Sequence, residues 1–161
     1  MTGQVVDGLL FRLSWDASIV PKKETNCAVS VCDIADRLQT LINDYFSRSR
    51  SIEQPHTLIH PAVMNSGSEF RRSAMAALSA IPYGETCTYS DLATQCGHPG
   101  AARAVGAVCR SNPIPILIPC HRVVSSNGIG GYAGLEQRIE LKRALLAIES
   151  SENHLLANNN K

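Results

Sequence analysis

The sequence predicts an α+β protein, with a small N-terminal domain of a sheet and a helix and a helical C-terminal domain. Strand-like alternation is confined to the first part of the chain, and helical spacing recurs after it. A stretch rich in Ser and Pro, residues 47–68, separates the two parts. We therefore expect domains at residues 1–60 and 66–150, and a disordered tail at residues 151–161.

Two short segments predict the N-terminal sheet. Residues 9–15 show partial strand alternation, and residues 29–31 are expected to pair with them. Residues 33–46 carry apolar side chains at helical spacing, with Asp33 as a candidate N-cap. This pattern predicts a helix that ends near Ser47.

Four helices are predicted in the C-terminal domain, over residues 68–80, 89–96, 101–110 and 137–148. The segment Gly-His-Pro-Gly at residues 97–100 is a tight turn between the second and the third of them. Two helices joined by a short turn predict a helix-turn-helix. The glycine-dense residues 125–134 lack the Lys-Ser/Thr pair of a phosphate-binding loop, so we interpret them as a loop that folds over a pocket.

The composition is that of an ordinary globular protein. Of its 161 residues 44% are hydrophobic and 18% charged, and no apolar run approaches the roughly 20 residues of a membrane span. The first 16 residues lack the basic region and apolar core of a signal peptide, so we expect a cytoplasmic protein without a membrane partner. We also expect it to be a monomer. Its six cysteines are accordingly expected to be reduced thiols.

The third predicted C-terminal helix, residues 101–110, consists largely of alanine and glycine. A helix that reads DNA sequence carries side chains able to reach base edges, whereas small residues let the backbone approach a groove without reading it. The same residues would also allow close packing between helices. No carboxylate occurs between residues 92 and 135, although the net charge is just +1. This part of the chain can therefore meet phosphate without repulsion, and a solvated basic loop would fit equally well.

A run of aliphatic residues bounded by prolines, residues 114–119, leads directly to Cys120 and His121. An imidazole close to a cysteine can lower the pKa of the thiol and activate it as a nucleophile. A cysteine in an apolar run is also often a small buried hydrophobe. The Cys-His pair by itself would also fit a hydrolase.

The segment Pro-Cys-His-Arg-Val at residues 119–123 resembles the active-site signature of the O6-alkylguanine-DNA alkyltransferases, also called methylated-DNA-protein-cysteine methyltransferases. Residues 81–86, 89–93, 101–107 and 111–113 follow the same family's order and spacing. The resemblance extends from about residue 67 to residue 148.

The resemblance implies direct-reversal repair, in which an alkyl group passes irreversibly from O6-alkylguanine in DNA to Cys120. It implies that His121 acts on the thiol through a water and that a carboxylate orients the imidazole. Glu149 matches that carboxylate, and Glu140 is the alternative. Asn112 matches a residue that ties the turn before Pro113 to the active-site segment.

The resemblance also implies how DNA is bound. The helix at residues 101–110 would lie in the minor groove of double-stranded DNA with little sequence preference, and the damaged nucleotide would be rotated out. Arg103 would fill the gap, and Tyr89 would crowd the phosphate and hydrogen-bond the guanine. The further residues expected at the DNA are Ala102 and Arg110. Those expected around the base are Pro115, Val123, Tyr132 and Ala133.

No cofactor is expected, although a structural zinc is conceivable because Cys27, Cys32, His56 and His60 have spacings that suit tetrahedral coordination. Two other functions stay open. A non-catalytic alkyltransferase-like protein would bind lesions without repairing them, but that group lacks the reactive cysteine. A Cys-His hydrolase, the remote alternative, would not explain the alanine-rich helix.

Overall fold

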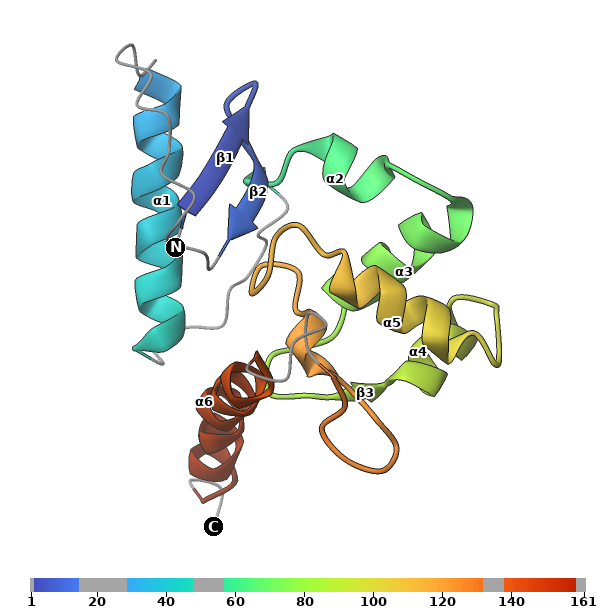
Figure 1. Ribbon diagram of the computed structural model, residues 1–161. Helices are drawn as coiled ribbons and strands as arrows, with labels where there is room; N and C mark the ends of the chain where they lie inside the picture. Colours follow the sequence, from blue (N-terminus) through green and yellow to red (C-terminus); the bar gives the residue numbers. More distant parts are fainter. Residues whose placement is uncertain (1, 15–28, 48–56, 132–137, 159–161) are drawn as a thin grey trace. The chain divides into compact units, whose positions relative to one another are not determined.

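The computed structural model describes residues 2–14, 29–47, 57–131 and 138–158 (Figure 1). The chain divides into two compact units, Met1–Asn65 with Pro113–Leu117, and Ser66–Asn112 with Ile118–Lys161. Each unit combines a two-stranded sheet with helices, which confirms the predicted α+β class. Pro113–Leu117 groups with the N-terminal unit, a feature that sequence spacing did not indicate.

The N-terminal unit contains a β-hairpin made of β1 (Thr2–Val6) and β2 (Leu9–Ser14). Asp7 and Gly8 join the strands with positive φ angles of 48° and 73°, as a tight hairpin turn requires. The predicted strand at residues 9–15 is confirmed, but its predicted partner at residues 29–31 is wrong. Those residues form the first turn of a helix, because the two-residue Asp-Gly turn pairs β2 with the neighbouring strand instead.

Helix α1 (Val29–Phe46) ends where it was expected but begins earlier than Asp33, so this residue is not its N-cap. The last part of the predicted connection also belongs to the N-terminal unit. Leu10 exchanges backbone hydrogen bonds with Leu58 and His60, at 2.7 and 2.9 Å, and α2 (Pro61–Asn65) follows. Buried apolar side chains at Leu58, Ile59 and Val63 explain why this stretch packs instead of linking.

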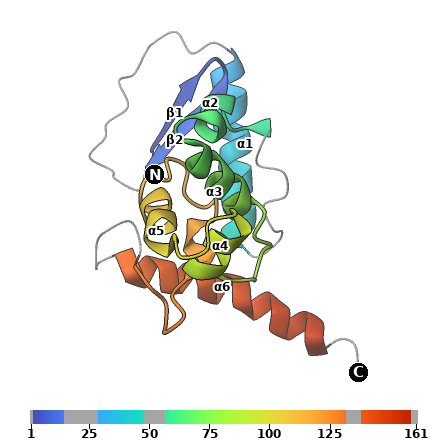
Figure 2. The same ribbon diagram turned by 90° about the vertical axis from the view of Figure 1, so that its right-hand side faces the viewer.

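Three helices form the core of the C-terminal unit: α3 (Glu69–Ser79), α4 (Tyr89–Gln95) and α5 (Ala102–Arg110), close to their predicted ranges. Ser68 caps α3 by accepting from the Arg71 amide at 3.2 Å. Thr88 caps α4 by accepting from the Asp91 amide at 3.1 Å. The three helices contact one another, as Figure 2 shows, and α4 and α5 are joined by the turn at residues 97–100.

Two short strands lie beside the segment of the C-terminal unit that contains Cys120. β3 (Cys87–Thr88) pairs in parallel with β4 (Val123–Val124), which follows the 3-10 turn η2 (Cys120–Arg122). The sheet therefore fixes the chain on the C-terminal side of Cys120 against the start of α4.

Helix α6 runs from Ile139 to Asn158. The helix therefore includes residues 151–158, which lie beyond the helix end at residue 148 that the sequence predicted. The sequence from residue 135 to residue 158 contains no glycine or proline that would end the helix. Among the residues that the structure describes, no helix is long and apolar enough to cross a bilayer.

Candidate active site

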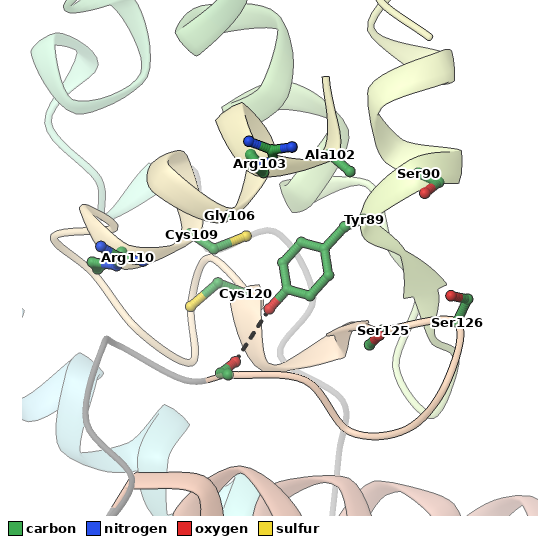
Figure 3. Close-up of a pocket in the computed structure, with 11 residues that line it drawn as sticks. Tyr89, Ser90, Ala102, Arg103, Gly106, Cys109, Arg110, Cys120, Ser125 and Ser126 are labelled. Carbon is green, nitrogen blue, oxygen red and sulfur yellow. Dashed lines mark hydrogen bonds between the residues drawn. The ribbon is translucent and has the colours of Figure 1, made fainter. Parts of the chain in front are cut away.

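Cys120, the first residue of η2, borders a cavity of about 510 Å³ in the C-terminal unit. Cys120 is 4% exposed, and it is one of the described residues that line the cavity. The cavity lies between α5, the start of α4 and the loop after β4 (Figure 3). It brings together five of the predicted residues: Cys120, Tyr89, Ala102, Arg103 and Arg110.

Asn112 holds the sulfur from the turn after α5. Its side-chain nitrogen donates to the carbonyl oxygen of Ile118 at 2.7 Å and to Sγ of Cys120 at 3.1 Å. Because a carbonyl oxygen can only accept, the amide nitrogen faces both partners, and the sulfur receives a hydrogen bond. Hydrogen bonding to the charged form of an acid favours that form, so Asn112 stabilises the Cys120 thiolate.

His121 and Glu149 form a buried pair next to Cys120 in the chain. Nε2 of His121 lies 2.7 Å from Oε1 of Glu149, and the two residues are 0% and 1% exposed. Glu140, the alternative carboxylate, is exposed and lies near Arg143, at 3.5 Å. The structure thus places Glu149, and not Glu140, against the imidazole.

Arg122 is the anchor of this pair that the sequence did not reveal. Its guanidinium donates to both carboxylate oxygens of Glu149, at 2.9 and 3.0 Å, and to the carbonyl of Ile81 at 2.7 Å. The Gly84 amide donates to the same carboxylate at 3.2 Å. A bidentate arginine is the strongest neutralising partner for a buried carboxylate. The sequence shows a charged residue directly after His121 in a largely apolar stretch, but not which groups it contacts.

These contacts determine the protonation states of Glu149 and His121. Burial would raise the pKa of Glu149, but the hydrogen bonds and charges of His121 and Arg122 outweigh it and lower the pKa to about 2. Burial lowers the pKa of His121, and the contact with Glu149 offsets this only in part. Because an ionised carboxylate can only accept, a neutral His121 carries its proton on Nε2. Its Nδ1 is then the nitrogen able to take up a proton.

The Tyr89 ring stands inside the cavity, with its hydroxyl donating to the carbonyl oxygen of Gly131 at 3.1 Å. A Cβ atom at Gly130 would lie 3.0 Å from the ring, and this residue has a φ of 71°, so glycine is required there. Burial, followed by the charges of nearby cysteine thiolates, raises the pKa of Tyr89 to about 12. The phenol therefore stays protonated at neutral pH and can donate.

Lys142 ties the loop after β4 to α6. Its ammonium group is buried and donates to the carbonyls of Val123 and Gly131, at 2.6 and 3.2 Å. Burial lowers its pKa to about 8, against the opposite effect of the cysteine thiolates. The Val123 carbonyl, predicted to recognise the base, thus already accepts one hydrogen bond. Lys142 and Glu149 are seven residues apart on the buried face of α6, a spacing that the sequence displays.

Some predicted residues lie elsewhere. Pro115 belongs to the segment grouped with the N-terminal unit and is not among the described residues that line the cavity. Tyr132 and Ala133 fall outside the described residues. The zinc hypothesis rests on side chains of which three, at Cys27, Cys32 and His56, are likewise not described. In the part of the chain that is described, no three His, Cys, Asp or Glu residues are grouped for a metal ion.

The chain is similar to known proteins in sequence and in fold. The family model described as 6-O-methylguanine DNA methyltransferase, DNA binding domain, matches residues 69–151. The methylated-DNA--protein-cysteine methyltransferase of Mycolicibacterium paratuberculosis is 51% identical over 84 residues, which cover 52% of this chain and 49% of that protein. The chain thus spans about half the length of the curated relatives it matches.

Two solved structures from Mycobacterium tuberculosis extend the likeness. The crystal structure of its O6-methylguanine methyltransferase has a TM-score of 0.66 at 32% identity, covering 89% of this chain and 82% of that one. The crystal structure of its OGT in complex with DNA has a TM-score of 0.62 at 39% identity, covering 72% of this chain and 67% of that one. On the family match and this coverage, the chain belongs to the 6-O-methylguanine DNA methyltransferase family.

Proposed function

We propose that the protein repairs DNA by direct reversal, moving an alkyl group, in the first place methyl, from O6-alkylguanine in double-stranded DNA to Cys120. One observation carries the proposal: a cysteine with a hydrogen-bonded sulfur borders a cavity of about 510 Å³, and the next residue is half of a buried His-Glu pair. This volume falls within the roughly 300–1,000 Å³ usual for small-molecule sites. Relatives named for this activity support it.

The chemistry is a single displacement. The Cys120 thiol gives its proton through a water to Nδ1 of His121, and the thiolate attacks the first carbon of the alkyl group. The new S–C bond forms as the C–O6 bond breaks, and the electron pair stays on guanine, which takes a proton. We propose that the Tyr89 hydroxyl donates this proton, since it remains protonated at neutral pH. The product is a thioether that water does not cleave, so each molecule acts once.

DNA binding is proposed for the surface around α5. Arg103 and Arg110 are exposed, lie seven residues apart on one side of α5, and both border the cavity. The residues between them are small, which suits close approach of the backbone to the minor groove with little base readout. The target base must leave the stack to reach Cys120, and Arg103 would then fill its place. We propose that the protein acts as a monomer and without a cofactor.

Intact-mass analysis after incubation with DNA containing O6-methylguanine tests this function. The expected result is one added methyl group, located on the peptide that contains Cys120. The variant Cys120→Ala should accept none while it still binds the same DNA. Binding without any methyl on the wild type would identify a lesion-binding module, and repeated turnover without a modified cysteine would identify a hydrolase.

A further inference from the structure

A second cysteine, Cys109, borders the same cavity as Cys120 and has no part in the proposed transfer. It lies in the last turn of α5, whereas Cys120 begins η2. Both are free thiols, and Figure 3 shows both side chains at this cavity, on the same side of the Tyr89 ring. Of the free cysteines that the structure describes, Cys87 and Cys96 are the other two, and neither borders the cavity.

Asn112 connects the two cysteines physically. Its backbone amide donates to the carbonyl oxygen of Cys109 at 3.3 Å, and its side chain donates to Sγ of Cys120 at 3.1 Å. One residue therefore holds the end of α5 and the reactive sulfur at once. Because Asn112 contacts both residues, a shift of this turn changes the separation of the two sulfurs.

The two thiols also differ in reactivity in the way a disulfide exchange needs. Burial and, second, the charge of Cys120 raise the pKa of Cys109 to about 12. Cys109 is therefore protonated while Cys120, which receives the Asn112 hydrogen bond, is the better thiolate. If Cys120 enters a mixed disulfide, its charge disappears, and one of the two causes that suppress the ionisation of Cys109 disappears with it.

We propose that Cys109 and Cys120 form an intramolecular disulfide by exchange with a small-molecule disulfide, and that this bond reversibly shields the nucleophile. The Cys120 thiolate attacks one sulfur of the small disulfide. The new S–S bond is a mixed disulfide on Cys120, and the other half of the small molecule leaves as a thiolate. Cys109 then loses its proton to solvent and attacks Sγ of Cys120, releasing the second small thiol. In total two protein thiols are oxidised to one disulfide, and the small disulfide is reduced to two thiols.

Oxidised glutathione is a suitable probe, followed by alkylation of remaining thiols and digestion with trypsin. Cleavage after Arg103, Arg110 and Arg122 places the two cysteines on separate peptides, residues 104–110 and 111–122. In the wild type we expect these two peptides to be joined by a disulfide that dithiothreitol cleaves. In Cys109→Ser and in Cys109→Ala, the peptide of residues 111–122 should instead retain one glutathione, because the resolving thiol is missing.

The matched control is Cys96→Ser, which removes a half-buried thiol outside the cavity and should still give the joined peptides. The proposal is overturned if wild-type peptide 111–122 retains glutathione as Cys109→Ser does, or if Cys120 pairs with another cysteine. The readout contains no DNA and no alkyl donor, so it is independent of the transfer activity. A protein that forms the disulfide but transfers no methyl would refute the proposed function and leave this inference intact.

Discussion

His121 and Glu149 lie 28 positions apart in the chain, yet Nε2 of the first is 2.7 Å from Oε1 of the second. The same carboxylate accepts two hydrogen bonds from Arg122 and one from the Gly84 amide. Because Arg122 keeps the carboxylate ionised, the imidazole must present Nε2 as a donor and Nδ1 as an acceptor. The relationship therefore determines which ring nitrogen can receive the thiol proton.

Replacing Glu149 by glutamine should slow alkyl transfer by about 10²-fold or more, since general-base assistance of this kind contributes roughly 10²–10⁴-fold. It also leaves Arg122 as an uncompensated buried charge, which should destabilise the fold by about 3–5 kcal/mol. Single-turnover rates on an O6-methylguanine duplex and urea unfolding measure the two effects. Glu140→Gln, a change of an exposed carboxylate on the same helix, should alter neither. Equal losses in both variants would contradict the assignment.

The free energy of unfolding should depend on pH through the Glu149 carboxylate. The pKa of Glu149 is about 2 in the folded protein against an ordinary value of 4.5, so between these values the unfolded chain binds more protons. The stabilisation is therefore complete above about pH 4.5 and is lost as the pH falls towards 2. Urea midpoints measured over this range should fall more steeply for the wild type than for Glu149→Gln. Parallel curves would show that another group causes the acid sensitivity.

Removing the Asn112 side chain should raise the pKa of the Cys120 thiol. A hydrogen bond to a charged group contributes about 1.5–3 kcal/mol, which corresponds to roughly one to two pH units. Asn112→Ala and, more strongly, Asn112→Asp should thus shift the pH profile of Cys120 alkylation by iodoacetamide to higher pH. Peptide mapping assigns the modified cysteine. A profile that does not move in Asn112→Asp would show that the 3.1 Å contact has no influence on the thiolate.

Arg103→Ala should impair repair of duplex DNA far more than the reaction with free O6-benzylguanine, because only the duplex leaves a gap for its side chain to fill. A loss of at least 10-fold in duplex repair is expected from unstacking costs of a few kcal/mol. Arg143→Ala, which removes the same charge from the exposed face of α6, is the control. If both substrates lose rate equally, Arg103 acts on the chemical step and not on the rotated nucleotide.

The elements predicted well are those with local signals. The starts of α3 and α4 and the glycine turn at residues 97–100 were predicted closely, because Ser68, Thr88 and the glycines that delimit these helices lie next to them in the sequence. The strand partner of residues 9–15 was mistaken because the β-branched Val29 and Val31 suit a strand as well as the first turn of a helix. The length of α6 was underestimated because polar composition after residue 150 resembles that of a disordered tail.

The residues of the candidate site also divide into those with a local sequence signal and those without one. Cys120 and His121 are adjacent in sequence and could be proposed from it, and the resemblance supplied Glu149. The role of Arg122 could not be read there, because its partners Glu149 and the Ile81 carbonyl come from distant segments that only the folded chain unites. Cys109 was overlooked for a related reason, since a lone thiol in an alanine-rich helix carries no sign of the cavity it borders.

The ion pair between Arg122 and Glu149 also limits how the proposed alkyl transfer can be lost over evolutionary time. A mutation of either residue removes the group that orients the His121 imidazole and also destabilises the domain. Proteins that carry such a mutation should therefore misfold and be lost. A substitution of Cys120 leaves the ion pair between Arg122 and Glu149 intact. Inactive descendants that persist should therefore differ at position 120 and keep the ion pair behind it.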